Sequence, residues 1–263
     1  KTWVEKTCSR FITKPPPSVE DLVAMVQPTA CEESSPPFAT FRESFDRPNT
    51  IQHWQLRDLI SPGDLDPSEV YCMYNNQTIR FDTTTGASKV VQELAYAPTS
   101  MTVGGGFIAA GGHHSQLDVT RLSDGATIYK STVGASVNNA LNIGVDHSGE
   151  QRLLVSNNDE TVKVYSLPDM QLVATIQCPV AINYAAMSPS GEHLVCVGDC
   201  NHVFLYSSRG YQRIATYNEA GDAGMCCAWN STSSNFACAF QDGTVCAWDL
   251  RSGQVLCKLK SRG

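Results

Sequence analysis

Residues 236–259 read FACAFQDGTVCAWDLRSGQVLCKL, and this stretch decides the fold. It contains three mainly apolar runs, separated by Gln241-Asp242-Gly243 and by residues 250–253. Aspartate followed by glycine between alternating apolar runs is a strong hairpin signal, because glycine accepts the positive φ of tight hairpin turns. The stretch therefore predicts two hairpins that share their middle strand.

The same unit recurs along the chain. The strand equivalent to residues 244–249 ends at Asp82, Arg121, Ser166, Ser207 and Asp249, so the spacings are 39, 45, 41 and 42 residues. A short buried run precedes each unit and supplies a fourth, innermost strand, as at residues 183–187. A period of about 40 to 45 residues with four strands is typical of β-propeller blades. The sequence predicts an all-β propeller with about five blades, at about residues 51–94, 97–133, 138–177, 180–217 and 223–260.

Residues 1–50 differ from the repeats because they contain many prolines. Only Ser18–Gln27 predicts a short helix, with Ser18 as its N-terminal cap. We predict a proline-rich N-terminal arm over residues 1–50 and a partial propeller over residues 51–263. Propellers with this repeat commonly have seven blades, and an open ring exposes an apolar flank. We therefore expect the natural protein to continue for about two more blades, or another element to cover this edge.

Composition and charge restrict the partners. The formal net charge is -7, so no basic field attracts nucleic acid, and no run reaches the length of about 18 apolar residues that a membrane span needs. Most of the eleven cysteines lie among apolar residues, which indicates a reducing compartment. We expect a soluble cytoplasmic or nuclear protein with no nucleic-acid or membrane partner, and a chain that begins at Lys1 is expected to be an excerpt.

Several motifs resemble binding sites but favour simpler interpretations. The glycines at residues 104–106 and 111–112 predict turns, since a phosphate loop must open a helix and strand residues follow here. The groups Cys196, Cys200, His202 and His113, His114, Asp118 are better explained as strand ends and hairpin turns than as metal ligands. Neighbouring cysteines at residues 226–227 predict inner-strand core, since neighbours on a strand point to opposite faces. We predict no catalytic residue, no cofactor and no metal.

The remaining candidate is a surface. In a propeller the turns between second and third strands gather with the links between blades on one face. The alternative is that polar residues in these turns are only good turn formers. The predicted interaction face contains Asn75, Asn76, His113, His114, Asn158, Asp159, Asn201, Gln241 and Asp242.

The stretch at residues 241–249 resembles the WD40 signature, with Trp248-Asp249 as its name-giving dipeptide. Other blades depart from it, because Tyr165-Ser166 and Tyr206-Ser207 stand at this position and no Gly-His dipeptide precedes an inner strand. The hydrogen-bond network of the family, which joins Asp, His, Ser or Thr, and Trp, is therefore in doubt. We expect packing to hold most blades.

Residues 54–60, 108–112, 156–159 and 183–191 resemble a eukaryotic family of WD-repeat proteins from fungi and plants, and this likeness spans about residues 41–263. Some fungal members look like substrate receptors of a RING-type ubiquitin ligase, the glucose-induced degradation complex. The resemblance implies a non-enzymatic protein interaction scaffold or adaptor and, in its most specific form, such a receptor. The alternative is a propeller enzyme or small-molecule binder with a site in the central channel.

Overall fold

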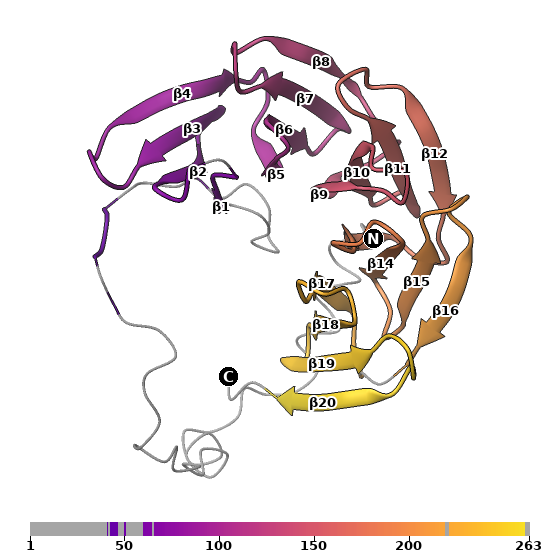
Figure 1. Ribbon diagram of the computed structural model, residues 1–263. Coiled ribbons are helices and arrows are strands. Elements are labelled where there is room, and N and C mark those ends of the chain that lie inside the picture. Colours follow the sequence, from indigo (N-terminus) through magenta and orange to yellow (C-terminus); the bar gives the residue numbers. More distant parts are fainter. Residues whose placement is uncertain are drawn as a thin grey trace, which may run out of the picture. The chain divides into compact units, whose positions relative to one another are not determined.

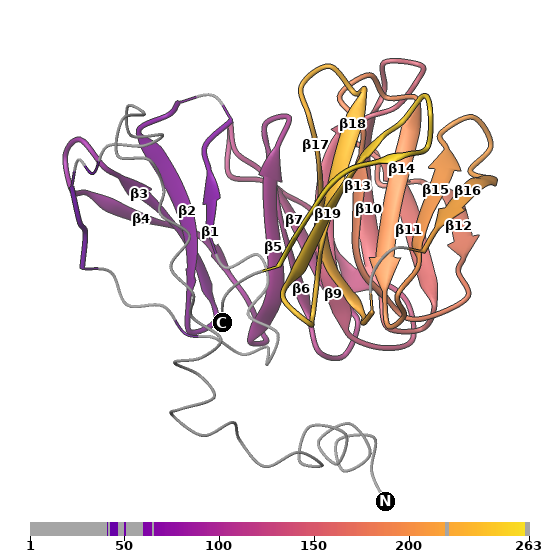
Figure 2. The ribbon, with the colours of Figure 1, turned by 90° about the horizontal axis from the view of Figure 1, so that it is seen from below.

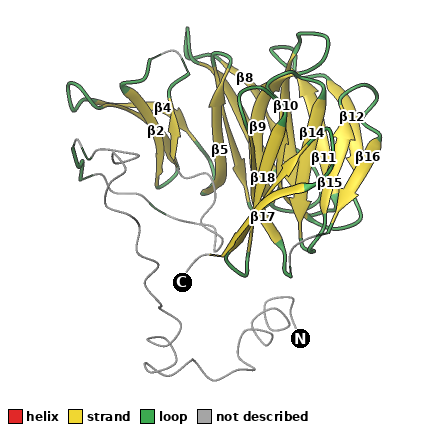
Figure 3. Cartoon of the chain, turned by 60° about the horizontal axis from the view of Figure 1, so that its bottom comes forward, coloured by secondary structure: helices red, strands yellow, loops and turns green. Residues whose placement is uncertain are grey.

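The computed structural model describes residues 41, 43–46, 50, 60–64, 66–218 and 221–260. The predicted helix at Ser18–Gln27 and most of the predicted arm over residues 1–50 lie outside them. Every described strand belongs to the compact unit formed by residues 45–261, and the architecture below is that of this unit. Strands and turns make up this part of the chain, with no helix among the described residues (Figure 3).

Five four-stranded antiparallel sheets each take four consecutive strands in chain order. The first contains β1 (Ile60–Pro62), β2 (Glu69–Tyr74), β3 (Gln77–Asp82) and β4 (Ser88–Glu93). The second contains β5 (Pro98–Gly104), β6 (Phe107–Gly112), β7 (Gln116–Arg121) and β8 (Thr127–Thr132). The third contains β9 (Asn138–Val145), β10 (Gln151–Asn157), β11 (Thr161–Ser166) and β12 (Leu172–Gln177). The fourth contains β13 (Ile182–Met187), β14 (His193–Gly198), β15 (Val203–Ser207) and β16 (Arg213–Tyr217). The fifth contains β17 (Gly224–Trp229), β18 (Asn235–Phe240), β19 (Thr244–Asp249) and β20 (Val255–Lys260).

The sheets follow one another around a curve, with the first strand of each on the inside and the fourth on the outside (Figure 1). The inner strands β1, β5, β9, β13 and β17 contact one another in that order. Seen from the side, the strands of each sheet run between two ends at which the turns lie (Figure 2). The five sheets are blades of a β-propeller, which confirms the predicted fold class.

Strand alternation builds the contacts between blades. In the fifth blade Phe236 pairs with Trp248 and Cys238 pairs with Cys246 across β18 and β19. Residues two apart on a strand share a face, so one flank of the sheet collects these side chains. The flank packs against Val195 and other apolar residues of the fourth blade. Burial of alternate residues therefore joins one blade to the next.

Trp248 anchors the fifth blade by packing. Its side chain is fully buried, and its ring stacks on Phe236 with centroids 5.3 Å apart. The indole Nε1 is buried without a hydrogen-bond partner among the described residues. The network that the WD40 signature usually carries is therefore not formed at this tryptophan.

The glycine turns were predicted only in part. Gly105 and Gly106 have positive φ and join β5 to β6, as expected of a turn, whereas Gly104 is the last residue of β5. The prediction of a turn at residues 111–112 was wrong, since β6 continues through both. A Cβ on Gly111 would lie 2.7 Å from Ser100 Oγ and 2.9 Å from Asn138 Cβ. Glycine is needed there because the neighbouring inner strands approach the backbone closely.

Candidate interaction face

The predicted face residues all lie in the five turns that join the second strand of a blade to the third. Asn75 and Asn76 join β2 to β3, and His113 and His114 join β6 to β7. The other turns supply Asn158 and Asp159, then Asn201, then Gln241 and Asp242. The structure therefore gives these residues equivalent positions in successive blades.

Backbone hydrogen bonds tie each turn to a link between blades. The amide of Val133 donates to the Ser115 carbonyl over 2.7 Å, and the amide of Cys178 donates to the Glu160 carbonyl over 2.8 Å. In the fifth blade the amide of Gln241 donates to the carbonyl of Ala223 over 2.8 Å. Turns and links therefore lie at one end of the sheets. We name this end the loop face, which comprises residues 75–76, 94–97, 113–115, 133–137, 158–160, 178–181, 199–202, 218, 221–223 and 241–243.

Three buried polar side chains join neighbouring blades beneath this face. Thr99 Oγ1 donates to the Asn138 carbonyl over 3.1 Å. Asn139 Nδ2 donates to the Ile182 carbonyl, and Asn183 Nδ2 donates to the Gly224 carbonyl, each over 2.9 Å. Each donor is the second residue of its inner strand, and each acceptor is the first residue of the next inner strand.

The same asparagines also hold the turns of their own blades. Asn139 Nδ2 donates to Asn158 Oδ1 over 3.2 Å, and Asn183 Nδ2 donates to Asp199 Oδ1 over 3.0 Å. In the fifth blade Met225 takes this position and has no such donor. These residues were not predicted from the sequence, although a polar residue at one repeated position of an otherwise apolar strand was the available signal.

The predicted face residues differ in how far they reach solvent. Asn75, Asn76, His113 and His114 are exposed, while the others are partly buried. Two of the partly buried residues accept backbone hydrogen bonds. Asp242 accepts from the Thr244 amide next to its own turn, and Asp159 accepts from the Ala135 amide of the link between the second and third blades, each over 2.9 Å. Residues of the first two blades therefore expose the largest fraction of their surface to a partner.

Carboxylates are the only permanently charged side chains among the described residues of the loop face. Its described residues contain no lysine or arginine and five carboxylates, which belong to Asp159, Glu160, Asp199, Asp222 and Asp242. Partial burial acts to raise the pKa of Asp159, but hydrogen bonds from Thr161 and Ala135 and the charge of Lys163 hold it below its ordinary value. The Thr244 amide lowers the pKa of Asp242. Both carboxylates are therefore ionised near neutral pH.

Comparison with known proteins agrees with this geometry. The family model for the WD domain, G-beta repeat, matches residues 213–249. A chain in the crystal structure of a mitotic checkpoint complex superposes with a TM-score of 0.70 over 89% of this chain and 75% of that chain, at 14% sequence identity. Residues 213–249 therefore form a WD40 repeat, and the chain has the fold of a β-propeller.

Two curated relatives share more of the sequence with this propeller. An uncharacterised protein of Schizosaccharomyces pombe is 31% identical over 209 residues, which are 76% of this chain and 59% of that protein. Protein ROOT INITIATION DEFECTIVE 3 of Arabidopsis thaliana is 28% identical over 144 residues, or 51% of this chain and 32% of that protein. The propeller thus matches less than two thirds of the length of either relative, and both come from the groups of organisms, fungi and plants, that the sequence resemblance indicates.

Loops held on a rigid scaffold often carry binding function, and the WD40 propeller fold typically serves as a scaffold for protein interactions. Ser208 Oγ does lie 3.1 Å from His147 Nδ1, but Ser208 is only 1% exposed, so a substrate does not reach this Ser-His pair. Within the described part of the chain, no three His, Cys, Asp or Glu residues are grouped so that they could hold a metal ion. None of the described residues forms a helix that could span a membrane.

Proposed function

We propose that this propeller is a non-enzymatic adaptor that holds a segment of a protein partner on the loop face. The observation that carries the proposal is the repeated tie between turns and links, which fixes five equivalent turns while Asn75, Asn76, His113 and His114 remain exposed. A scaffold that is rigid before binding loses little conformational entropy when a partner docks. Exposed turn residues on rigid strands therefore suit recognition of a protein.

Charge favours one kind of partner segment. Asp159 pairs with Lys163 over 3.5 Å, and the other four carboxylates of the loop face, without lysine or arginine among its described residues, attract a segment of net positive charge. Association driven by opposite charges weakens as salt screens them. Binding to this face should therefore become slower as ionic strength rises.

Site-specific crosslinking tests the proposal. A photoreactive residue is placed at Asn76 or His114 on the loop face and, as matched controls, at Thr84 or Ser123 in exposed turns that join third to fourth strands. We expect a protein partner to crosslink from the first two positions and not from the controls. A partner that crosslinks only from residues 84 and 123 would contradict the proposal.

The specific assembly we propose is a RING-type ubiquitin ligase, in which the propeller is a substrate receptor in the cytoplasm or nucleus. Its support is the resemblance of residues 54–60 and 183–191 to WD-repeat proteins that include such receptors. Purification of the natural full-length protein followed by mass spectrometry tests it. Ligase subunits should co-purify, and their reproducible absence contradicts the receptor role while the crosslinking test still decides the adaptor role.

A further inference from the structure

A hollow lies between the third and fourth blades and reaches the loop face only at residues 178–179. The end of β12 and the link after it, residues 175–179, form one wall. Tyr206, Tyr211 and Arg213 of the fourth blade form the other. No acidic side chain lines this hollow. The polar side chains that line the hollow are therefore neutral groups that can donate hydrogen bonds and one cation.

Arg213 is the cation of this hollow, and it forms no ion pair with a described carboxylate. Four other arginines of the described chain do form ion pairs, namely Arg80, Arg121, Arg152 and Arg209. The guanidinium carbon of Arg213 lies 5.8 Å from the centroid of the Phe204 ring. An arginine held over an aromatic ring keeps its N–H groups available for a bidentate contact with an oxyanion.

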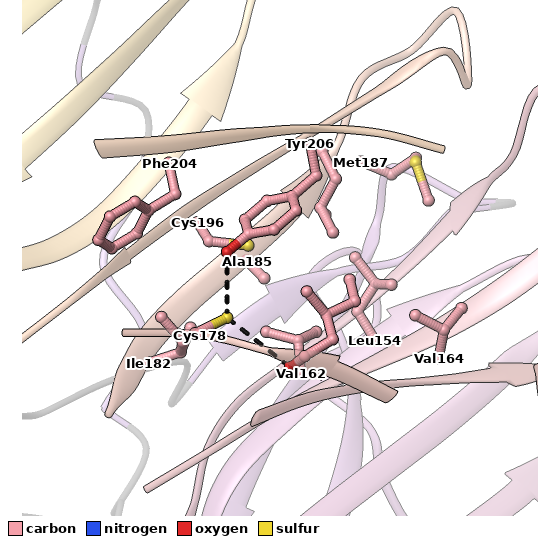
Figure 4. Close-up of a cluster of buried hydrophobic side chains, with 12 residues drawn as sticks. Leu154, Val162, Val164, Cys178, Ile182, Ala185, Met187, Cys196, Phe204 and Tyr206 are labelled. Carbon is pink, nitrogen blue, oxygen red and sulfur yellow. Dashed lines mark hydrogen bonds between the residues drawn. The ribbon is translucent and has the colours of Figure 1, made fainter. Parts of the chain in front are cut away.

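Neutral donors line the same hollow as this guanidinium. Tyr206 Oη donates to Cys178 Sγ over 3.5 Å, from within the buried cluster beneath the hollow (Figure 4). Sulfur is a weak acceptor, so the hydroxyl can turn to an oxyanion at little cost. Burial raises the pKa of Tyr206, which keeps this hydroxyl protonated. Thr175 and Gln177 add further donor groups at the wall.

Tyr211 holds an uncommon backbone conformation at this hollow, with φ of 56°. The equivalent turn position in the first, second and fifth blades is a glycine, at Gly86, Gly125 and Gly253. A bulky residue at positive φ is strained, and it persists where its surroundings hold it. The ring of Tyr211 packs against the buried cluster and walls the hollow.

We propose that this hollow is a second binding site, which takes a carboxylate or phosphate group carried by a segment of a protein partner. Arg213 would donate two hydrogen bonds to the oxyanion, and the Tyr206 hydroxyl would donate a third. The site goes beyond the proposed adaptor function because the groups that would bind the oxyanion, on Tyr206 and Arg213, lie outside the loop face. It gives a partner a second point of attachment.

Nuclear magnetic resonance titration tests the site with sodium phosphate and sodium acetate as probes, at constant ionic strength. The Arg213 side-chain N–H signals and the amides of residues 175–178 should shift and saturate with at least one probe. The probe that binds more tightly identifies phosphate or carboxylate as the preferred group. Arg213→Gln should weaken this binding about tenfold or more, since a hydrogen bond to a charged group contributes about 1.5–3 kcal/mol.

Two controls separate this site from general charge effects and from the loop face. Arg251→Gln removes another arginine without an ion pair among the described residues, on an exposed turn of the fifth blade, and should leave the titration unchanged. Tyr206→Phe should weaken binding severalfold with the fold intact. His114→Ala on the loop face should have no effect. Shifts that do not saturate, or that are equal in the wild type and Arg213→Gln, would overturn the proposal.

Discussion

The third and fifth blades have the same strand order, yet only the fifth has the residues by which such blades are recognised in sequence. Residues 248–249 are Trp-Asp and lie within the matched repeat, whereas the equivalent residues 165–166 are Tyr-Ser. Both aromatic side chains are buried, Trp248 completely and Tyr165 with 8% exposure. The shared architecture therefore does not depend on the signature dipeptide.

The two blades also differ where the backbone turns most tightly. In the fifth blade Gly243 and Gly253 have φ of 78° and 67°. The equivalent positions of the third blade hold Glu160 and Met170, with φ of 66° and 52°. Hairpin spacing and strand alternation fix the conformation in both blades. Glycine lowers the strain of this positive-φ conformation, but the turn does not require glycine.

The largest effect should come from the signature tryptophan. Trp248→Ala should lower the free energy of unfolding by about 3–5 kcal/mol, because it opens a cavity in a completely buried cluster. Tyr165→Ala in the third blade should lower it less, since Tyr165 keeps 8% exposure and its ring lies 6.0 Å from that of Tyr129. Urea unfolding followed by circular dichroism measures both.

Trp248→Phe is the matched control for the indole group. It should lower the free energy of unfolding by only about 1–2 kcal/mol, because the phenyl ring is smaller than the indole. The Nε1 group adds nothing to this loss, since it has no hydrogen-bond partner among the described residues. If Trp248→Phe were as costly as Trp248→Ala, a polar contact of the indole rather than its packing would anchor the blade.

A smaller effect is expected from the asparagine beneath the loop face. Asn139→Ala should cost about 1–3 kcal/mol, because it leaves the buried Ile182 carbonyl and Asn158 Oδ1 without this donor. Met225→Leu at the equivalent position of the fifth blade should cost less than about 1.5 kcal/mol. Amide hydrogen exchange should also become faster in the turn at residues 158–160. Equal costs for the two variants would show that the bridge contributes nothing beyond packing.

The sequence predicted the blades well because the residues that specify each hairpin are close together in the chain. Apolar alternation and turns such as residues 241–243 specify each hairpin within about ten residues, and the repeat spacing then counts the blades. The close approach at Gly111 was missed because it depends on Ser100 and Asn138, which belong to neighbouring inner strands. Periodicity gives the number of blades and says little about how closely their backbones meet.

The sequence predicted where the candidate face lies, but it did not predict the buried side chains that hold its turns. Turn chemistry located residues 158–159 and the other face residues, since asparagine and aspartate favour such turns. Asn139 was missed because its partner Ile182 is 43 residues away, in the next blade. The contact role of the face residues stays a prediction, because the same residue types serve as turn formers and as binding residues.

The smallest effect should come from the positive-φ turns. Glu160→Gly should raise the free energy of unfolding by about 0.5–1 kcal/mol, since relief of left-handed strain exceeds the added freedom of the unfolded chain. Gly243→Ala at the equivalent turn should lower it by about 1 kcal/mol. Thermal and urea unfolding of the two variants measure these opposite signs. If Glu160→Gly were also destabilising, the glutamate side chain would contribute contacts that offset its backbone strain, and the two blades would differ in more than local turn chemistry.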